Sequence, residues 1–389
     1  MKMYQIFSFL SFLSITLLLN PIVFAAEGLK FADIEVIPWG EIKVQYDDNV
    51  FLDSADEKDD IIVTLSPGIS LERPFKDNLL KFDYHAEINK FTDHSSQDAT
   101  NHYVSGELEV NWQELTFNIY DDFSRVFERP STEDTSRVKR DDNIAGITVM
   151  LQKHRLGIQL GYENLIRNYR SEPDYDAYDR KDSTYSLMVT HQTFPKTKLL
   201  CEYDFSQIRY EESTRSDSDY HQFLVGAMGE LTPKINATIK AGYQFRDYER
   251  ESEPDFDAGV LYADSIYTIS SKDALKISFL RSANESTYGV NNFYKIENVS
   301  AVFDHFFSKK LLGFITGIYQ INSYPRETTE GTETQKRKDR YASLGAGFRY
   351  YMKEWLTLTL QVEHIGRDSN FETFDYSQNL VTLSAKAVF

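Results

Sequence analysis

The 389-residue chain lacks several features that would place it in a common class of protein. It has a single cysteine, Cys201, so no disulfide can form within the chain. Beyond the first 25 residues, no apolar run approaches the roughly 20 residues that a membrane-spanning helix needs, which excludes a helical membrane protein. The 42 Lys and Arg against 60 Asp and Glu give a formal net charge of −18, which argues against a nucleic-acid partner.

Signatures of catalysis and of metal binding are also missing. The sequence has no H-E-x-x-H, no G-x-S-x-G, no Walker-type glycine-rich loop and no Cys/His cluster, and its eight histidines are scattered. We therefore predict neither enzyme activity nor a cofactor nor a metal. A lipid hydrolase that brings Ser and His together across neighbouring strands is the enzymatic alternative.

The first 25 residues predict a secretory signal peptide. Lys2 supplies the positive end, an apolar run follows, Pro21 ends it, and Val23 and Ala25 place small residues at the −3 and −1 positions of a cleavage site. We predict cleavage after Ala25, with residues 26–389 forming one exported domain. An uncleaved anchor helix is the alternative.

Alternation with a period of two recurs along the rest of the chain. In residues 235–246, 80–89 and 356–363, apolar and polar side chains alternate, so that each stretch has one apolar and one polar face. Each stretch is about 10 residues long, which is the length of a tilted strand that crosses a bilayer. Averaging over two such faces explains why the mean hydropathy is only −0.46.

The connections between these stretches alternate between short and long. Short ones fall near residues 75–78, 113, 153–155, 194–197, 232–233, 270–272, 308–310 and 352–354; long polar ones fall near residues 47–59, 93–100, 127–141, 170–182, 211–218, 249–254, 285–290, 325–337 and 368–372. The number and alternation of these connections predict an all-β fold, a transmembrane antiparallel β-barrel of about 18 strands with short periplasmic turns and long acidic outer loops. The predicted location is the bacterial outer membrane. The 14% of aromatic residues then fit girdles at the two membrane interfaces.

The end of the chain resembles the C-terminal strand signal that the insertion machinery of outer-membrane proteins reads. Its apolar face and aromatic final residue are Val381, Leu383, Ala385, Ala387 and Phe389. We therefore expect the barrel assembly machinery to be a partner.

Charged residues on the polar faces of the predicted strands are the candidates for lining the lumen. They are Lys81, Asp83, Glu87, Glu107, Glu109, Glu202, Asp204, Lys240, Arg246, Arg349 and Glu363. Both signs occur, which suits an aqueous path or a lumen braced by ion pairs, and a barrel of 16–18 strands has room for a channel. Whether a loop plugs that channel stays open. Cys201 is predicted to face lipid.

Residues 42–51, with the run Tyr-Asp-Asp-Asn-Val-Phe, and residues 61–71, which contain Ser66-Pro67-Gly68, resemble the opening of the putative beta-barrel porin 2 family. In that family a first strand ends in such a run and a Thr-Pro-Gly-like strand follows; Ser66 is a minor departure. The resemblance implies an outer-membrane barrel, and for many members an association with exopolysaccharide or capsule export.

On this resemblance we expect a passive conduit for exopolysaccharide or capsule. A general diffusion or nutrient porin and a closed structural or adhesive barrel are the alternatives. The expected partners are outer-membrane lipid and lipopolysaccharide, the barrel assembly machinery, a periplasmic polysaccharide-export protein, and no nucleic acid.

Overall fold

A computed structural model of the chain describes residues 28–31, 33–170, 174–212, 214–251 and 253–389. The predicted signal peptide lies outside the described residues. The strands are β1 (Leu29–Phe31), β2 (Ile34–Asp47), β3 (Asp60–Phe75), β4 (Asn78–Phe91), β5 (Ala99–Trp112), β6 (Leu115–Glu128), β7 (Val138–Lys153), β8 (Leu156–Tyr169), β9 (Arg180–Gln192), β10 (Thr197–Tyr210), β11 (Ser218–Thr232), β12 (Ile235–Tyr248), β13 (Phe256–Thr268), β14 (Asp273–Glu285), β15 (Phe293–Ser308), β16 (Leu311–Glu330), β17 (Glu333–Lys353), β18 (Leu356–Ser369) and β19 (Tyr376–Val388). Short 3₁₀ helices are η1 (Ser95–Gln97), η2 (Asp176–Tyr178) and η3 (Glu372–Phe374).

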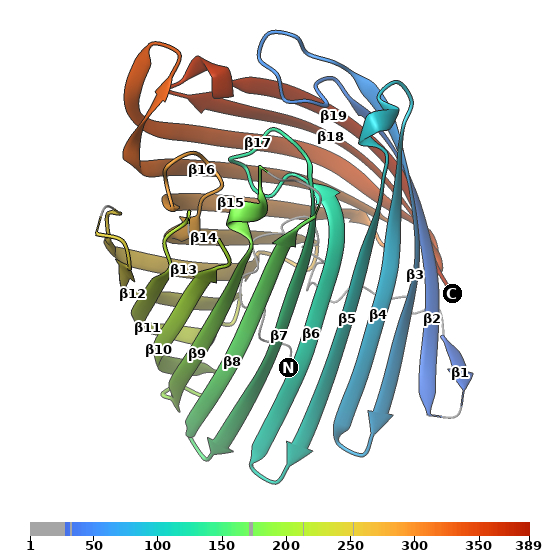
Figure 1. The fold of residues 1–389 in the computed structure, drawn as a ribbon. Coiled ribbons are helices and arrows are strands. Elements are labelled where there is room, and N and C mark those ends of the chain that lie inside the picture. The colour runs from blue at the N-terminus through green and yellow to red at the C-terminus, as the bar shows by residue number, and fades with distance from the viewer. Residues whose placement is uncertain (1–27, 32, 171–173, 213, 252) are drawn as a thin grey trace.

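The strands form one closed antiparallel ring (Figure 1). Each strand from β2 onward pairs with its neighbours along the chain, and β19 pairs with β2 from Leu380 opposite Asp47 to Val388 opposite Trp39. This closure confirms the predicted all-β barrel of 18 strands. The three-residue β1 pairs with β2 outside the ring and was not predicted.

Closure is what lets such a sheet span a membrane. A sheet in hydrocarbon must pair every backbone N–H and C=O, and only a ring without edges does so. Within the described residues, no helix combines the length and the apolar character needed to cross a bilayer.

Side chains alternate between the two faces of the ring. Large apolar residues at every second position are exposed on the outside, as Leu344 and Phe348 are on β17 and Leu360 and Val362 are on β18. Because residues paired in register share a face, this parity can be followed from strand to strand around the whole ring. The intervening positions point into the barrel.

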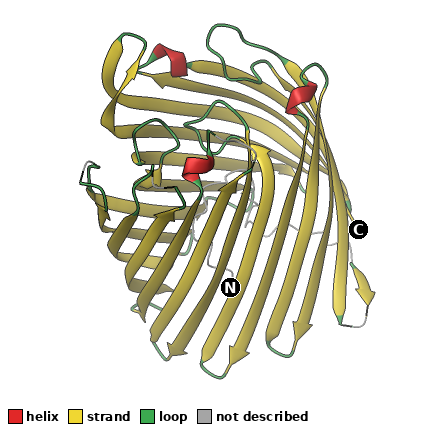
Figure 2. Ribbon diagram, viewed as in Figure 1, coloured by secondary structure: helices red, strands yellow, loops and turns green. Residues whose placement is uncertain are grey.

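The two ends of the barrel differ as predicted, with short turns at one end and longer connections with the 3₁₀ helices at the other (Figure 2). One predicted loop is wrong, however. Residues 325–337 were expected to be a long loop, but β16 and β17 continue through most of them and are joined by a tight turn at Gly331, whose φ is 61°. Threonines favour extended backbone, and the Thr329 and Thr334 hydroxyls lie 2.8 Å apart across this hairpin.

Candidate functional site

All eleven candidate lumen residues occupy the alternate strand positions whose side chains point into the barrel, which we call inward parity; the other positions have outward parity. They form three groups: five residues on β4 and β5, four on β10 and β12, and two on β17 and β18. Asp204 and Arg246 are buried, whereas Asp83 is exposed. Their part in solute passage stays a prediction.

The inward face of β4–β6 carries carboxylates whose hydrogen-bond partners are mostly neutral. We call Asp83, Glu87, Glu107, Glu109 and Glu128 the acidic wall. The neutral donors and their carboxylates are Ser70 with Asp83, Asn118 with Glu107 (2.9 Å), Asn111 with Glu109 (2.9 Å), and Tyr103 with Glu128 (2.8 Å). Among the described residues, the only cation in an ion pair with this wall is Lys81, 4.0 Å from Glu107. Hydroxyl and amide donors hold a carboxylate in place without cancelling its charge, so this side of the lumen keeps a negative field.

Elsewhere on the inward face, several carboxylates are paired with arginines. Asp142 lies between Arg140 (2.9 Å) and Arg167 (2.6 Å), and all three side chains are largely buried. Two similar pairs are Arg180 with Asp182 (3.2 Å) and Arg337 with Asp339 (2.8 Å). The inward Arg246 also pairs with Glu285, which lies at the end of β14 beyond the part of that strand that pairs with β13. The acidic wall gathers five carboxylates on three neighbouring strands, whereas other inward carboxylates with neutral partners stand singly, as Asp204 does with Gln222 (3.0 Å) and Asp264 does with Ser278 (2.5 Å).

The loop of residues 129–137, between β6 and β7, folds into the barrel. We call it the inward loop. On its own side of the ring, Arg129 donates a hydrogen bond to the Val50 carbonyl (2.8 Å) and Arg137 donates one to Gln97 (3.1 Å).

The tip of the inward loop is bound to the other side of the barrel. Gln320 on β16 donates to the Thr132 hydroxyl (2.7 Å), and Arg367 on β18 donates to the Thr132 carbonyl (2.8 Å). The Glu133 carboxylate accepts hydrogen bonds from the Ser286 hydroxyl and from the Thr287 amide (2.9 Å) in the β14–β15 loop. In the ring order, β15 and β16 lie opposite β6 and β7, so the inward loop crosses the lumen.

The carboxylates at this tip are unusually placed. Glu133 is only 4% exposed, and the Thr287 hydroxyl bonds both Glu133 (3.1 Å) and Asp134 (2.9 Å). Burial, together with the neighbouring Asp134, raises the pKa of the Glu133 carboxyl. We refer to this set of bonds between the inward loop and the β14–β15 loop as the latch.

Sequence reasoning missed the inward loop and one further feature of the lumen. Met188, Leu200 and Met228 have inward parity on β9–β11 and pack into a buried apolar cluster, so the inner face is not uniformly polar. Leu200 lies two residues before Glu202 on β10 and so has the same inward parity. The alternation along this strand could therefore have predicted that Leu200 faces the lumen. No comparable signal marks the loop.

The outward face carries the remaining sequence candidates. Val381, Leu383, Ala385 and Ala387 have outward parity on β19, and the Phe389 amide donates to the Pro38 carbonyl (2.9 Å) on β2. Cys201 is exposed on β10 with outward parity.

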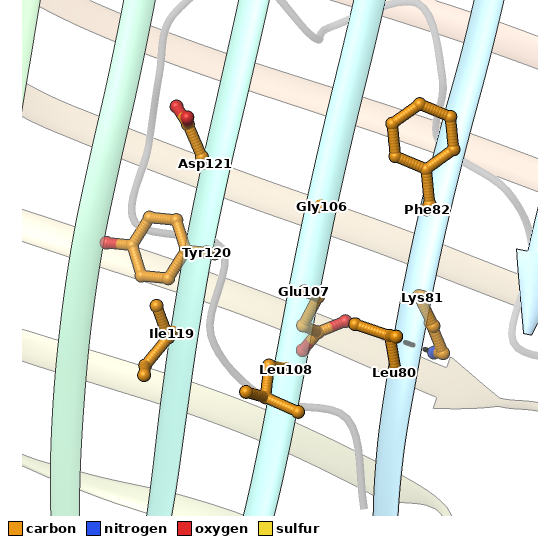
Figure 3. A pocket seen from close by; sticks show the side chains of 9 residues that line it. All are labelled: Leu80, Lys81, Phe82, Gly106, Glu107, Leu108, Ile119, Tyr120 and Asp121. Carbon is orange, nitrogen blue, oxygen red and sulfur yellow. Dashed lines mark ion pairs between the residues drawn. The ribbon is translucent and has the colours of Figure 1, made fainter. Parts of the chain in front are cut away.

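A shallow depression on this outward face lies over Gly106 on β5 (Figure 3). Phe82, Ile119 and Asp121 border it, and it lies on the outer side of the same strands whose inner side carries the acidic wall. Among the described residues, no group of three or more His, Cys, Asp or Glu side chains is arranged to hold a metal ion.

Comparison with known proteins agrees with this architecture. Residues 21–389 match the sequence profile of the family described as Putative beta-barrel porin 2. The fold is similar to the outer membrane protein opdK from Pseudomonas aeruginosa, with 12% identity, a TM-score of 0.50, and coverage of 91% of this chain and 99% of that one. It is also similar to a BenF-like porin from Pseudomonas fluorescens Pf-5, with 8% identity, a TM-score of 0.52, and coverage of 92% of this chain and 100% of that one. No curated protein sequence matches the chain.

Proposed function

The chain belongs to the putative beta-barrel porin 2 family, and from this premise we propose that it is a passive diffusion channel for small hydrophilic solutes. Its family and fold place it in the bacterial outer membrane. The confirmed family resemblance had suggested exopolysaccharide or capsule as cargo. The comparisons give that cargo no support, and the general diffusion porin fits them better.

The inward loop is the observation that carries the proposal. It crosses the lumen and is hydrogen-bonded on both sides, to Val50 on one side and to Gln320 and Arg367 on the other. A crossing segment divides the cross-section of a wide barrel, which favours small solutes over a polymer chain. An 18-strand barrel still has room for water beside such a segment.

The acidic wall supports a preference for cations. Four of its five carboxylates are held by hydroxyl or amide groups, which leave a negative charge in place, and a low-dielectric wall focuses this field into the lumen. Cations are then concentrated along the path and anions are depleted.

Planar-bilayer recording of the folded full-length barrel tests both parts of the proposal. We expect discrete conductance steps and, in a tenfold KCl gradient, a reversal potential of the cation-selective sign, bounded at about 59 mV for ideal selectivity. The variant with Asp83→Asn, Glu87→Gln, Glu107→Gln and Glu109→Gln should move that potential toward zero and keep the steps.

The matched control removes four carboxylates from the outside of the protein. Asp56→Asn, Glu57→Gln, Asp247→Asn and Asp257→Asn lie on exposed positions and should leave the reversal potential near the wild-type value. A flat trace from correctly folded protein would refute the channel and favour the closed structural or adhesive barrel. An equal shift in both variants would refute the role of the acidic wall.

A further inference from the structure

The short turns at the periplasmic end of the barrel carry a ring of basic side chains. Seven of the eight turns contribute to it, and we call the set the basic rim. Its members, all exposed, are Lys76, Lys153, Arg155, Lys196, Lys234, Lys272, Lys309, Lys310 and Lys353.

The basic rim is positively charged although the chain as a whole has a net charge of −18. The acidic side chains in these turns or next to them are Asp33, Asp77, Glu114, Glu230, Asp273 and Glu354. Only two rim cations take part in ion pairs among the described residues: Lys153 with Glu114 (3.8 Å) and Lys196 with Glu230 (2.6 Å). The other ammonium and guanidinium groups have no ion pair within the described residues, although Lys234 donates a hydrogen bond to the Ile269 carbonyl (2.9 Å) and Lys272 precedes Asp273. Their charge can attract a partner outside the chain.

Exposed aromatic residues next to the turns indicate where the basic rim lies relative to the membrane interface. Phe75 precedes Lys76, Phe194 lies two residues before Lys196, and Trp355 lies two residues after Lys353. Aromatic side chains of a membrane barrel lie at the interface between hydrocarbon and headgroups. Long basic side chains beside them extend their charge to the level of lipid phosphates.

We propose that the basic rim binds the headgroups of anionic phospholipids in the inner leaflet of the outer membrane. Charge complementarity fits phosphate, and the rim continues directly from the apolar belt that lipid chains cover. The even spread of the cations over the turns fits a shell of lipid around the barrel. A protein that docks on one side of the barrel would instead require the cations to cluster on that side.

Two tryptophans provide a natural reporter for this binding. The chain has three tryptophans: Trp112 and Trp355 are exposed next to the short turns, and Trp39 has inward parity. Brominated lipid that touches an indole quenches its fluorescence. Vesicles of phosphatidylcholine that contain either brominated phosphatidylglycerol or brominated phosphatidylcholine therefore report which headgroup gathers at the rim.

For the folded full-length barrel, we expect brominated phosphatidylglycerol to quench more strongly, corresponding to a preference of roughly fivefold for each lysine-bound headgroup at low salt. Added salt should reduce this preference. The variant with Lys76, Lys234, Lys272, Lys309, Lys310 and Lys353 changed to Gln keeps three rim cations and should lose most of the preference. The matched control changes six exposed lysines near the outer end to Gln, namely Lys58, Lys90, Lys139, Lys181, Lys336 and Lys338, and should keep the preference.

Heat-modifiable migration on a gel checks that each variant is folded. If the sixfold variant does not fold, two triple variants divide the rim, Lys196/Lys234/Lys272 and Lys76/Lys310/Lys353, and each should lose part of the preference. Equal quenching of the wild type by the two lipids would overturn the proposal, and so would a preference that is undiminished in the rim variants. Lysine-dependent binding to purified peptidoglycan without a lipid preference would overturn it in favour of the cell wall.

Discussion

Release of the latch should enlarge the channel. In the variant Ser286→Ala/Thr287→Val, the side chains keep nearly the same shape, but both hydroxyls that donate to Glu133 and Asp134 are lost. The Thr287 amide remains as a donor, so Glu133 keeps one of its bonds.

The size of the effect follows from the burial of the carboxylates. A hydrogen bond to a charged group contributes about 1.5–3 kcal/mol, and Glu133 is too buried for water to replace the lost donors freely. Taking the lower figure for each hydroxyl gives about 3 kcal/mol, which shifts the equilibrium between bound and released loop on the order of a hundredfold. The barrel itself should keep its stability, because these bonds tie a loop and not a strand.

Single-channel recording measures the result. We expect a larger unitary conductance or more open-channel noise than in the wild type, with unchanged migration of the folded protein on a gel. The control Thr329→Val loses a hydroxyl that lies against Thr334 at the far hairpin and should behave as the wild type does. If the double variant has wild-type conductance and wild-type noise, the latch does not hold the inward loop across the path.

Three further outcomes are expected. Asp142→Asn leaves two buried guanidiniums without their carboxylate and should lower the free energy of unfolding by about 3–5 kcal/mol, whereas Asp141→Asn removes a more exposed pairing and should cost about 1 kcal/mol or less; urea titration of gel mobility compares them. Phe389→Ala should slow assembly into membranes more than Phe307→Ala does, although both rings are similarly exposed, and pulse-labelled assembly assays would show equal rates if the terminal signal is unimportant. Because burial raises the pKa of both Glu133 and Asp134 in the bound loop, the latch is stabilised at low pH and weakened as pH rises through these raised pKa values. Conductance should therefore increase with pH in the wild type, and a Glu133→Gln/Asp134→Asn channel that still shows this rise would contradict the assignment.

The barrel could be predicted because its environment acts on every strand separately. Lipid on one side and the lumen on the other impose a period of two that is readable within ten residues, as in β12. The inward parity of Lys240 and Arg246 follows from the same phase. The hairpin of residues 325–337 escaped this reasoning because polar residues occupy both of its faces and it has no apolar face to read.

The inward loop could not be predicted, since its contacts join residues far apart in the chain. Ser286 and Glu133 are 153 residues apart, and Arg367 and Thr132 are 235 apart. The side chains that make these contacts are ordinary serine, threonine, glutamine and arginine, whose types carry no signature of a partner. Only closure of the ring shows that β6 and β16 lie opposite each other.

The hairpin of β16 and β17 is also a natural place to insert foreign sequence. Gly331 at its tip has φ 61°, and an added side-chain carbon there would meet no heavy atom within 4 Å. Its strands are the longest of the described chain, at 20 and 21 residues, so the tip is separated from the membrane belt by paired backbone. A peptide epitope placed after Gly331 would be presented outside intact cells on a rigid two-stranded stem, and antibody labelling of those cells would report the topology of the whole barrel without its purification.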